Sequence, residues 1–446
     1  MRQSEPDVIV RDPIWDTIRL EPVPLRIVDS GAFQRLRHIK QLGHAHLVYP
    51  GATHTRFDHA LGVYHLARRA LALLAERGQL ERVTATDRRL IPLAGLLHDI
   101  GHYPFSHALE ELQADRIPGH HEALVGRFLA DPAVAVALAD IGPDAATRIE
   151  ALIRGASESP LQGLVSGSLD LDKIEYLKRD AYFCGVPFGE VDVDRLLHAM
   201  TVAQDAHTGS LEIAVHEKGV AALESLLFAK YQMFRNVYWH HAVRAATVLY
   251  KRVVSDALDA ALLEAGELVG QTDDGVLHLL AERARTCASA GGQRVGRWVE
   301  DLRRRHLPKR AAEVVAADLD QVDVGAWIEF DTPLKRRAEE QIARDLGLGE
   351  GQVFLDYPEK TAMFGLDLLV VRRNGRVTRI GPGGQAGLIG LPRIADELYR
   401  SARVMRLFTH GERRSVPAAD LAALAALDTE DILRRLDSGT ALLSAT

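Results

Sequence analysis

An apolar stretch that contains two adjacent polar side chains constrains this chain more than any other feature. Residues 89–100 are apolar on nearly every face, a pattern typical of a helix buried at the centre of a fold, and Gly101 is placed to end it. His98 and Asp99 lie in this stretch, so an imidazole and a carboxylate are expected inside a buried helical wall. Because a buried charge is costly unless it is paired or binds a metal, these two side chains indicate a site.

Two more side chains complete a set that suits a divalent metal. His59 lies upstream of His98 and Asp99, and Asp172 lies downstream of them. The four supply two nitrogen and two oxygen ligands, which suit Fe, Mn, Ni or Zn, with Mg as a further candidate. Any one of them alone is more simply a hydrogen-bonded core histidine or a capping aspartate. The set as a whole predicts the metal site of a hydrolase that acts at phosphorus.

Length and composition set the broad class of the protein. The 446 residues can bury a large core, and 47% hydrophobic with 26% charged residues is ordinary for a globular chain. The net charge of −7 argues against general nucleic-acid binding. No apolar run has the length of a membrane span or of a signal peptide, and two cysteines are too few for a disulfide framework. We therefore expect a cytoplasmic protein without membrane or nucleic-acid partners.

Hydrophobic periodicity predicts a mainly α fold with a smaller α+β appendage. Residues 1–50 are expected to form an N-terminal regulatory and interface segment, residues 51–318 the helical catalytic core, and residues 319–446 the appendage. In the first segment an extended stretch at 8–13 precedes a helix at 33–40. Further helices are expected from residue 56 onward and around residues 121–131, 144–155, 170–182, 192–203, 217–235 and 238–266.

The appendage mixes strand and helix patterns. Residues 327–330 are expected to form a strand and residues 335–346 an amphipathic helix. The runs 367–373 and 375–380 flank an Asn-Gly pair, which is a strong signal for a β-hairpin. The last predicted elements are a helix and a strand, at residues 391–401 and 404–409.

Three further histidines offer proton transfer beside the predicted metal ligands. His102 lies one helical turn after His98 and is the first candidate for the general acid. His121 is the second candidate, Glu110 is placed to orient one of the two, and His107 is suited to holding phosphate. The simpler interpretation of each histidine, as a cap or a satisfied loop residue, stays open.

Cations and aromatic residues near these motifs suit a phosphorylated substrate. Arg56 precedes His59 by three residues, and Lys173 is adjacent to Asp172, so both can bring positive charge to a phosphate. Tyr176 and Tyr238 can stack on a sugar or a base, although aromatic residues at helical spacing more often belong to the core.

The order of these motifs resembles the HD-domain metal phosphohydrolases. The runs 33–43, 49–52 and 98–107 look like those of the deoxynucleoside-triphosphate (dNTP) triphosphohydrolases of the SAM-and-HD-domain type. The similarity extends from about residue 8 to residue 409, and the SAM module is absent from it. This resemblance implies a helical HD-domain metal phosphohydrolase core. It also implies an enzyme that cleaves a dNTP to the deoxynucleoside and inorganic tripolyphosphate, by attack of water on the α-phosphorus.

The resemblance also assigns roles to individual residues. The residues that match the family's metal ligands are His59, His98, Asp99 and Asp172. The residues that match its catalytic and phosphate-contacting histidines are His102, His107 and His121. The residues that match its contacts to the triphosphate and the sugar are Arg56, Lys173 and Tyr176, with Gln41 and Asp180 matching the pair that reads the 3′-hydroxyl.

Regulation by a guanine nucleotide is a further expectation from the resemblance. Many family members are tetramers activated by a guanine nucleotide at subunit interfaces, and Asp29, Gln34 and Arg37 match the guanine-reading positions. A carboxylate accepts from the guanine N1–H and amino group, and an arginine donates to O6 and N7. We therefore expect GTP or dGTP to bind there and a homo-oligomer, tetramer or dimer, to form. Two positions depart from the family pattern, Val8 and Arg11, and the alternative for the guanine-reading residues is a structural salt bridge.

Two other functions remain open from the sequence. A nucleoside monophosphate phosphatase or a cyclic-nucleotide phosphodiesterase keeps the same metal site, and Gln41 and Lys173 favour a triphosphate over both. A nucleotide-sensing regulator keeps only a residual site, and the complete ligand set argues against it.

Overall fold

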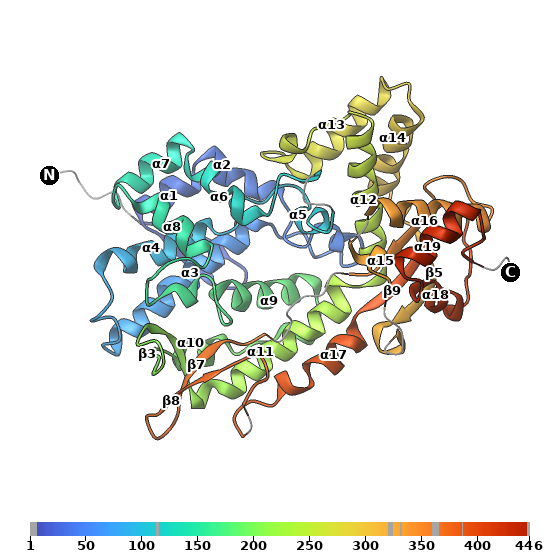
Figure 1. Cartoon of the computed structure of the whole chain (residues 1–446). Helices are drawn as coiled ribbons and strands as arrows, with labels where there is room; N and C mark the ends of the chain where they lie inside the picture. The colour runs from blue at the N-terminus through green and yellow to red at the C-terminus, as the bar shows by residue number, and fades with distance from the viewer. Residues whose placement is uncertain are drawn as a thin grey trace.

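The computed structural model describes residues 7–112, 116–319, 324–330, 332–358, 365–385 and 387–443. The chain is mainly helical, as predicted, with small β-sheets (Figure 1). The N-terminal helices gather at one end, the C-terminal helices at the other, and α9 and α11 run through the middle between them (Figure 1). Among the described residues, no helix combines the length and apolar character that a membrane crossing requires.

Three helices form the centre of the body and carry the residues of interest. These are α3 (Arg56–Glu76), α4 (Ala85–Leu97) and α9 (Leu171–Cys184), and α3 packs against both of the others. A capping box starts α3, because Asp58 accepts hydrogen bonds from the backbone and the hydroxyl of Thr55. The predicted helix at 89–100 is buried as expected, but α4 already ends at Leu97. His98 is its C-cap, so Asp99 lies in the following turn.

The remaining helices of the body cover this centre. The predicted helices of the core are present with shifted ends, and the structure adds short and later helices that were not predicted. Their bounds are α5 Ser106–Leu109, α6 His121–Leu129, α7 Pro132–Ala139, α8 Ala145–Ile153, α10 Val193–Ala199, α11 Val220–Met233, π-helix η7 Phe234–Tyr238, α12 His241–Asp259, α13 Asp273–Arg285 and α14 Ala290–Arg303.

The N-terminal segment distributes its helix differently from the prediction. The extended stretch is one strand of a hairpin, in which β1 (Val8–Asp12) pairs with β2 (Asp16–Leu20), and α1 (Pro22–Val28) follows. The predicted helix at 33–40 is a short α2 (Gly31–Gln34) continued by the 3₁₀ helix η1 (Arg35–His38). It ends early because Lys40 leaves the helix, forming a bridge to Thr55 and donating its amide to the Asp273 carboxylate.

A four-stranded sheet joins the core to residues late in the chain. Its order is β3 (Met200–Gln204), β4 (Leu211–His216), β7 (Leu368–Val371) and β8 (Val377–Ile380). The hairpin predicted at 367–380 is confirmed, and β7 adds to β4 in parallel. The predicted helix at 192–203 is wrong in its second half, since it ends at Ala199 and becomes β3.

A second sheet has β9 (Val404–Thr409) between β5 (Lys309–Val315) and β6 (Val353–Asp356). The strand predicted at 327–330 is wrong: residues Ala326–Phe330 form the short helix α15, in which the buried Trp327 donates to the Leu427 carbonyl. The helices predicted at 335–346 and 391–401 and the strand at 404–409 are present. The C-terminal helices are α16 Thr332–Asp345, α17 Ala395–Ala402, α18 Ala418–Ala425 and α19 Thr429–Ser438.

Both sheets pair strands from either side of the predicted boundary at residue 319, which itself stays a prediction. Buried ion pairs also join the two sides. Arg244 on α12 donates to both oxygens of Glu111, at 2.7 and 2.8 Å, and to Asp356 on β6. Breaking such a pair leaves an uncompensated buried charge, so α12 is fixed between the two sides.

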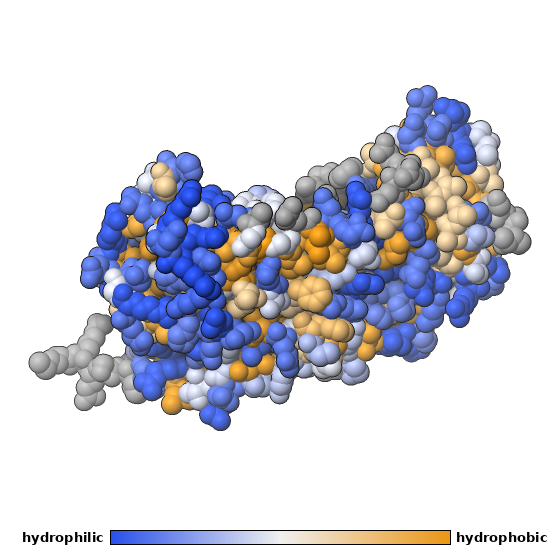
Figure 2. Space-filling model, turned by 90° about the horizontal axis from the view of Figure 1, so that it is seen from below, coloured by the Kyte–Doolittle hydropathy of each residue, from blue (hydrophilic) through white to orange (hydrophobic). Residues whose placement is uncertain are grey.

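One face of the molecule is apolar at its middle. Figure 2 shows hydrophobic side chains gathered over the region of α11 and α17, with hydrophilic surface toward both ends. Phe228 on α11 is 45% exposed and Ile394, just before α17, is 53% exposed. Exposed apolar side chains grouped in this way are more typical of a contact surface than of a free one.

Candidate active site

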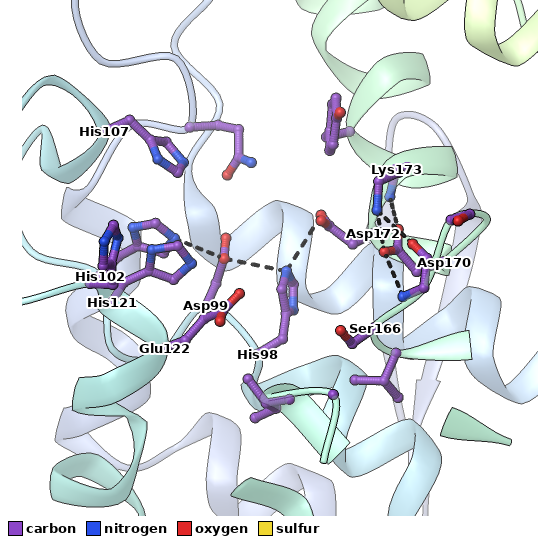
Figure 3. A pocket seen from close by; sticks show the side chains of 18 of the residues that line it. His98, Asp99, His102, His107, His121, Glu122, Ser166, Asp170, Asp172 and Lys173 are labelled. Atoms are coloured by element: carbon purple, nitrogen blue, oxygen red, sulfur yellow. Dashed lines mark hydrogen bonds and ion pairs between the residues drawn. The ribbon is translucent and has the colours of Figure 1, made fainter. Parts of the chain in front are cut away.

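A cavity of about 1290 Å³ is lined by both the helical body and the four-stranded sheet. Its wall combines the start of α3, the turn after α4, the first turn of α9 and residues of β4, β7 and β8. At its centre, His98, Asp99 and Asp172 direct their polar atoms toward one another (Figure 3). The residues predicted to bind substrate line the same cavity: Gln41, Arg56, His107, Lys173, Tyr176, Asp180 and Tyr238.

The structure brings the four predicted metal ligands together. The Nε2 atom of His59 lies 3.1 Å from His98 Nε2 and 2.9 Å from Asp172 Oδ1. The donor atoms of these three residues all lie within 4.8 Å of one another. Asp99 approaches from the side, with Oδ1 at 3.3 Å from His98 Nε2. Ligand atoms about 3 Å apart can share one ion, because each metal–ligand bond is about 2.0–2.2 Å long.

The protonation of the cluster also fits a cation. Burial opposes charge on His59, but its hydrogen bonds to Asp172 and Glu175 prevail and raise its pKa to about 10. Burial likewise opposes charge on His98, and Asp99 and Asp172 raise its pKa. Protons and metals compete for the same nitrogen lone pairs. The negative potential that favours protons on His59 and His98 therefore also favours a divalent metal in place of those protons.

Hydrogen bonds from the other ring nitrogens aim the two histidines. His59 Nδ1 lies 2.5 Å from Glu175 Oε2, and His98 Nδ1 donates to the Gly95 carbonyl at 2.8 Å. Each bond fixes the tautomer that leaves Nε2 facing the cluster. Glu175 is therefore a functional residue that the sequence interpretation missed, although it follows Asp172 by three residues and so shares its helix face.

Glu175 belongs to a buried chain of charges. It accepts from Arg179 Nε at 2.7 Å and from Trp15 Nε1 at 2.9 Å, and Arg179 also donates to Asp12 at 3.0 Å. Glu175 and Arg179 are both fully buried. Gly62 leaves space for them, since a Cβ atom there would lie 2.0 Å from Glu175 Oε1.

Asp99 connects the metal ligands to a cation and to the histidine cluster. Its Oδ2 accepts from Arg56 at 2.7 Å, and its Oδ1 lies 3.0 Å from His102 Nε2. The other nitrogen of His102, Nδ1, lies 2.6 Å from Ser106 Oγ. Both ring nitrogens of His102 are thus engaged within the protein. Burial, with the charges of Arg56 and His121, holds its pKa well below the usual value.

His121, His107 and Glu110 form the outer part of the histidine cluster. The His121 ring stacks on the His102 ring, with centroids 3.6 Å apart. Glu110 lies 3.0 Å from His121 Nδ1 through one oxygen and 3.0 Å from His107 Nδ1 through the other. Burial opposes ionisation of Glu110, yet these histidines hold its pKa well below the usual range. Glu110 thus orients both rings, as predicted for one of them.

Two lysines lie on the side of the site formed by α9 and α11, and of these Lys173 lines the cavity. Lys173 pairs with Asp170 and donates to the Gly167 carbonyl at 2.8 Å (Figure 3). Lys230, on α11, lies near enough to interact electrostatically with Lys173 and Asp172. Burial, and to a smaller extent the charge of Lys173, lower the pKa of Lys230 to about 8. Sequence analysis missed Lys230, because only the fold brings α11 beside α9.

Several polar side chains surround Asp180 at the cavity wall. The carboxylate lies 2.7 Å from His54 Nε2 and accepts from the Tyr238 hydroxyl at 2.7 Å. Gln41 is held beside His54, because its backbone amide donates to the His54 carbonyl at 3.0 Å. The Gln41 Oε1 atom is buried and finds no hydrogen-bond partner among the described residues. His54 was missed, although it lies two residues before Arg56 in the same conspicuous motif.

The predicted guanine-reading residues lie apart from this cavity. Asp29 is exposed and caps the end of α1. Arg37 donates to Gln34 Oε1 at 2.8 Å, and its guanidinium lies 3.5 Å over the Phe57 ring. Within the described part of the chain, no ion pair between Asp29 and Arg37 is found, so the salt bridge considered as an alternative is not formed.

We predict that Glu175→Gln weakens metal binding by about 10–100-fold, because His59 loses the charged partner that fixes its orientation. Bound metal, titrated against a chelator, is the measurement. Glu158→Gln is the matched control, since Glu158 is an exposed carboxylate of the same cavity wall. Equal metal affinities in the two variants would contradict the assignment.

Comparisons with known proteins agree with this geometry. The family model of the HD domain matches residues 56–140, and that of the HD associated region matches residues 191–382. An uncharacterized protein of Methanocaldococcus jannaschii is 32% identical over 352 residues, which cover 78% of this chain and 69% of that protein. A deoxynucleoside triphosphate triphosphohydrolase of Danio rerio is 32% identical over 53% of this chain, and the match spans 43% of that enzyme.

A solved phosphohydrolase of Bacteroides thetaiotaomicron has the same fold. It superimposes with a TM-score of 0.70 over 91% of this chain and 100% of its own, at 21% identity. The matched families, the relative matched over more than two thirds of its length, and the cluster of histidines and aspartates lead to one conclusion. The chain belongs to the HD-domain phosphohydrolases, a family of enzymes that hold a divalent metal.

Proposed function

We propose that this enzyme hydrolyses deoxynucleoside triphosphates to a deoxynucleoside and inorganic tripolyphosphate. The observation that carries the proposal is the pairing of two features in one cavity. Lys173 lines the cavity beside Asp172, and Lys230 lies close enough to interact with both, while Gln41 presents a buried acceptor for which the described residues offer no partner. A triphosphate suits the lysines, and a sugar hydroxyl suits the amide oxygen, since an unpaired buried acceptor gains by receiving a hydrogen bond.

The candidate metal ligands hold the reacting phosphate at the centre of the cavity. A divalent metal bound by His59, His98, Asp99 and Asp172 would supply the charge that polarises a phosphoester and acidifies water. Arg56 adds a second positive charge, and its bond to Asp99 fixes the position of that charge. Because both Arg56 and Asp99 are almost fully buried, little water screens their interaction with the substrate.

The geometry favours His121 as the donor of a proton to the leaving oxygen. Both nitrogens of His102 are engaged, by Asp99 and by Ser106. His121 has only Nδ1 engaged, by Glu110, and no hydrogen bond from its Nε2 is found among the described residues. The carboxylate of Glu110 holds the ring through Nδ1, so Nε2 is the nitrogen left to act on the substrate. His102 then serves to position Asp99, and the exposed His107 is placed to contact phosphate.

Activation by GTP or dGTP at Asp29, Gln34 and Arg37, in a homo-oligomer, forms part of the proposal. Asp29 is exposed and available to accept from a guanine. The 3₁₀ helix η1, which carries Arg37, also carries Arg35, and Arg35 donates to the carbonyls of His102 and Ile100, both at 2.7 Å. Ordering of this helix by a nucleotide would therefore reach the turn that contains Asp99.

The first prediction concerns the products. Purified protein with Mn²⁺ is expected to convert a dNTP to deoxynucleoside and tripolyphosphate, and ¹⁸O from water is expected in the tripolyphosphate. Asp172→Ala is expected to lose bound metal and to lower the rate by about 1000-fold, since metal charge contributes several kcal/mol. Pyrophosphate or single phosphates as primary products would instead indicate a different hydrolase.

The second prediction is a dependence on pH. Lys230 is charged below its pKa of about 8 and neutral above it, so triphosphate binding weakens as the pH rises through 8. We expect kcat/KM for a dNTP to fall above pH 8. Lys230→Arg keeps the charge at every accessible pH and is expected to remove this fall. Identical alkaline limbs in the two proteins would exclude Lys230 from binding.

The third prediction tests regulation. GTP is expected to raise the turnover of dCTP by about 5–150-fold, a usual range for coupling between two sites. Asp29→Ala removes the carboxylate that distinguishes guanine and is expected to lose this response while keeping its basal rate. ATP is the control nucleotide. Equal rates with and without GTP in the unaltered protein would leave the enzyme constitutively active.

A further inference from the structure

The turn that carries Ser106 and His107 has an unusual backbone conformation. Phe105, which precedes α5, has φ 50° and ψ 34°, in the left-handed region. A bulky residue rarely adopts this conformation, and it persists only where the surroundings impose it. What holds Phe105 therefore determines where the following side chains point.

A cluster of aromatic rings holds Phe105 in place. His44 stacks on the Phe105 ring with centroids 4.2 Å apart and planes 11° from parallel. Tyr250, on α12, packs against both rings, at 4.6 Å from Phe105 and 5.4 Å from His44. Gly43 lets the chain approach closely, because a Cβ atom there would lie 3.3 Å from Phe105 Cδ1.

The His44 ring acts here as a flat neutral surface. It is 5% exposed, and its Nε2 atom is buried without a hydrogen-bond partner. Burial, with smaller contributions from His46 and Lys40, lowers its pKa to about 3. The stack on Phe105 and the edge contact with Tyr250 are thus the interactions that fix the ring.

The helix that follows Phe105 connects this cluster of aromatic rings to the histidine cluster. Ser106 Oγ lies 2.6 Å from His102 Nδ1, and His107 shares Glu110 with His121. His44, Phe105, Ser106 and His107 all line the cavity. A rotation at Phe105 would move Ser106 and His107 together, while the metal ligands on α3 and α9 would stay in place.

We propose that His44 is a positioning residue, which holds the left-handed Phe105 by stacking and so aims Ser106 and His107 at the substrate. The inference rests on the proposed hydrolase function only for its kinetic test. It assigns a role to a residue that contacts neither the metal ligands nor the histidine cluster directly.

The experiment compares two replacements of His44. His44→Phe keeps a flat ring, and His44→Leu keeps an apolar side chain without one. We expect His44→Phe to retain the unaltered kcat, and His44→Leu to lower kcat by about 10–100-fold with little change in KM or bound metal, as for a small misplacement of catalytic groups. His38→Leu, at an exposed histidine of η1, is the control for the substitution itself.

The contrary outcomes are distinct. Full activity in His44→Leu, or equal loss in His44→Phe and His44→Leu with metal still bound, would overturn the stacking role. Phe105→Gly removes the other ring while tolerating a positive φ, and it is expected to lower kcat similarly; full activity there would also overturn the proposal. This variant decides the question if His44→Leu does not fold.

A measurement without substrate separates this inference from the proposed function. In histidine-labelled protein, the ring resonance of His107 is expected to shift in His44→Leu and to stay unchanged in His44→Phe. If the unaltered protein hydrolysed no dNTP, this comparison would still test the stack. An unshifted His107 resonance in His44→Leu would overturn the proposal.

Discussion

The buried contact between His59 and Glu175 is the constraint on which the candidate site depends. One carboxylate fixes the tautomer of a metal-facing histidine and also receives Arg179 and Trp15. Through these bonds α3, α9 and the loop that joins β1 to β2 are held to one geometry, and Gly62 leaves the space they require. Removing one charged member of such a buried network leaves its partner uncompensated, so the metal site and the packing of the N-terminal hairpin are interdependent.

Sequence periodicity was sufficient to predict the helices that bury one apolar face against the core. The helices that carry His59 and Asp172 were predicted near their observed bounds, because apolar residues recur along each at helical spacing. The strand β3 was predicted as helix, and residues 327–330 as strand. Each of those segments depends on a partner outside itself: β3 pairs with the next strand, β4, and Trp327 of α15 donates to the Leu427 carbonyl, far along the chain.

The residues of the candidate site were also predicted only in part. The four residues proposed as metal ligands occur in conspicuous motifs, and the structure brings them together. Glu175, His54 and Lys230 were missed because each acts through a neighbour: Glu175 on His59, His54 on Asp180, and Lys230 beside Lys173. The role of such a residue becomes visible only when tertiary packing brings it beside the group on which it acts.

The parallel pairing of β7 with β4 has a consequence for how the molecule is made. All the proposed metal ligands emerge from the ribosome by residue 172, whereas the part of the cavity wall on β7 begins at Leu368. At about 5–20 residues per second, roughly 10–40 s separate the two events. A nascent chain therefore contains all the proposed metal ligands well before the strands that complete the cavity wall are made.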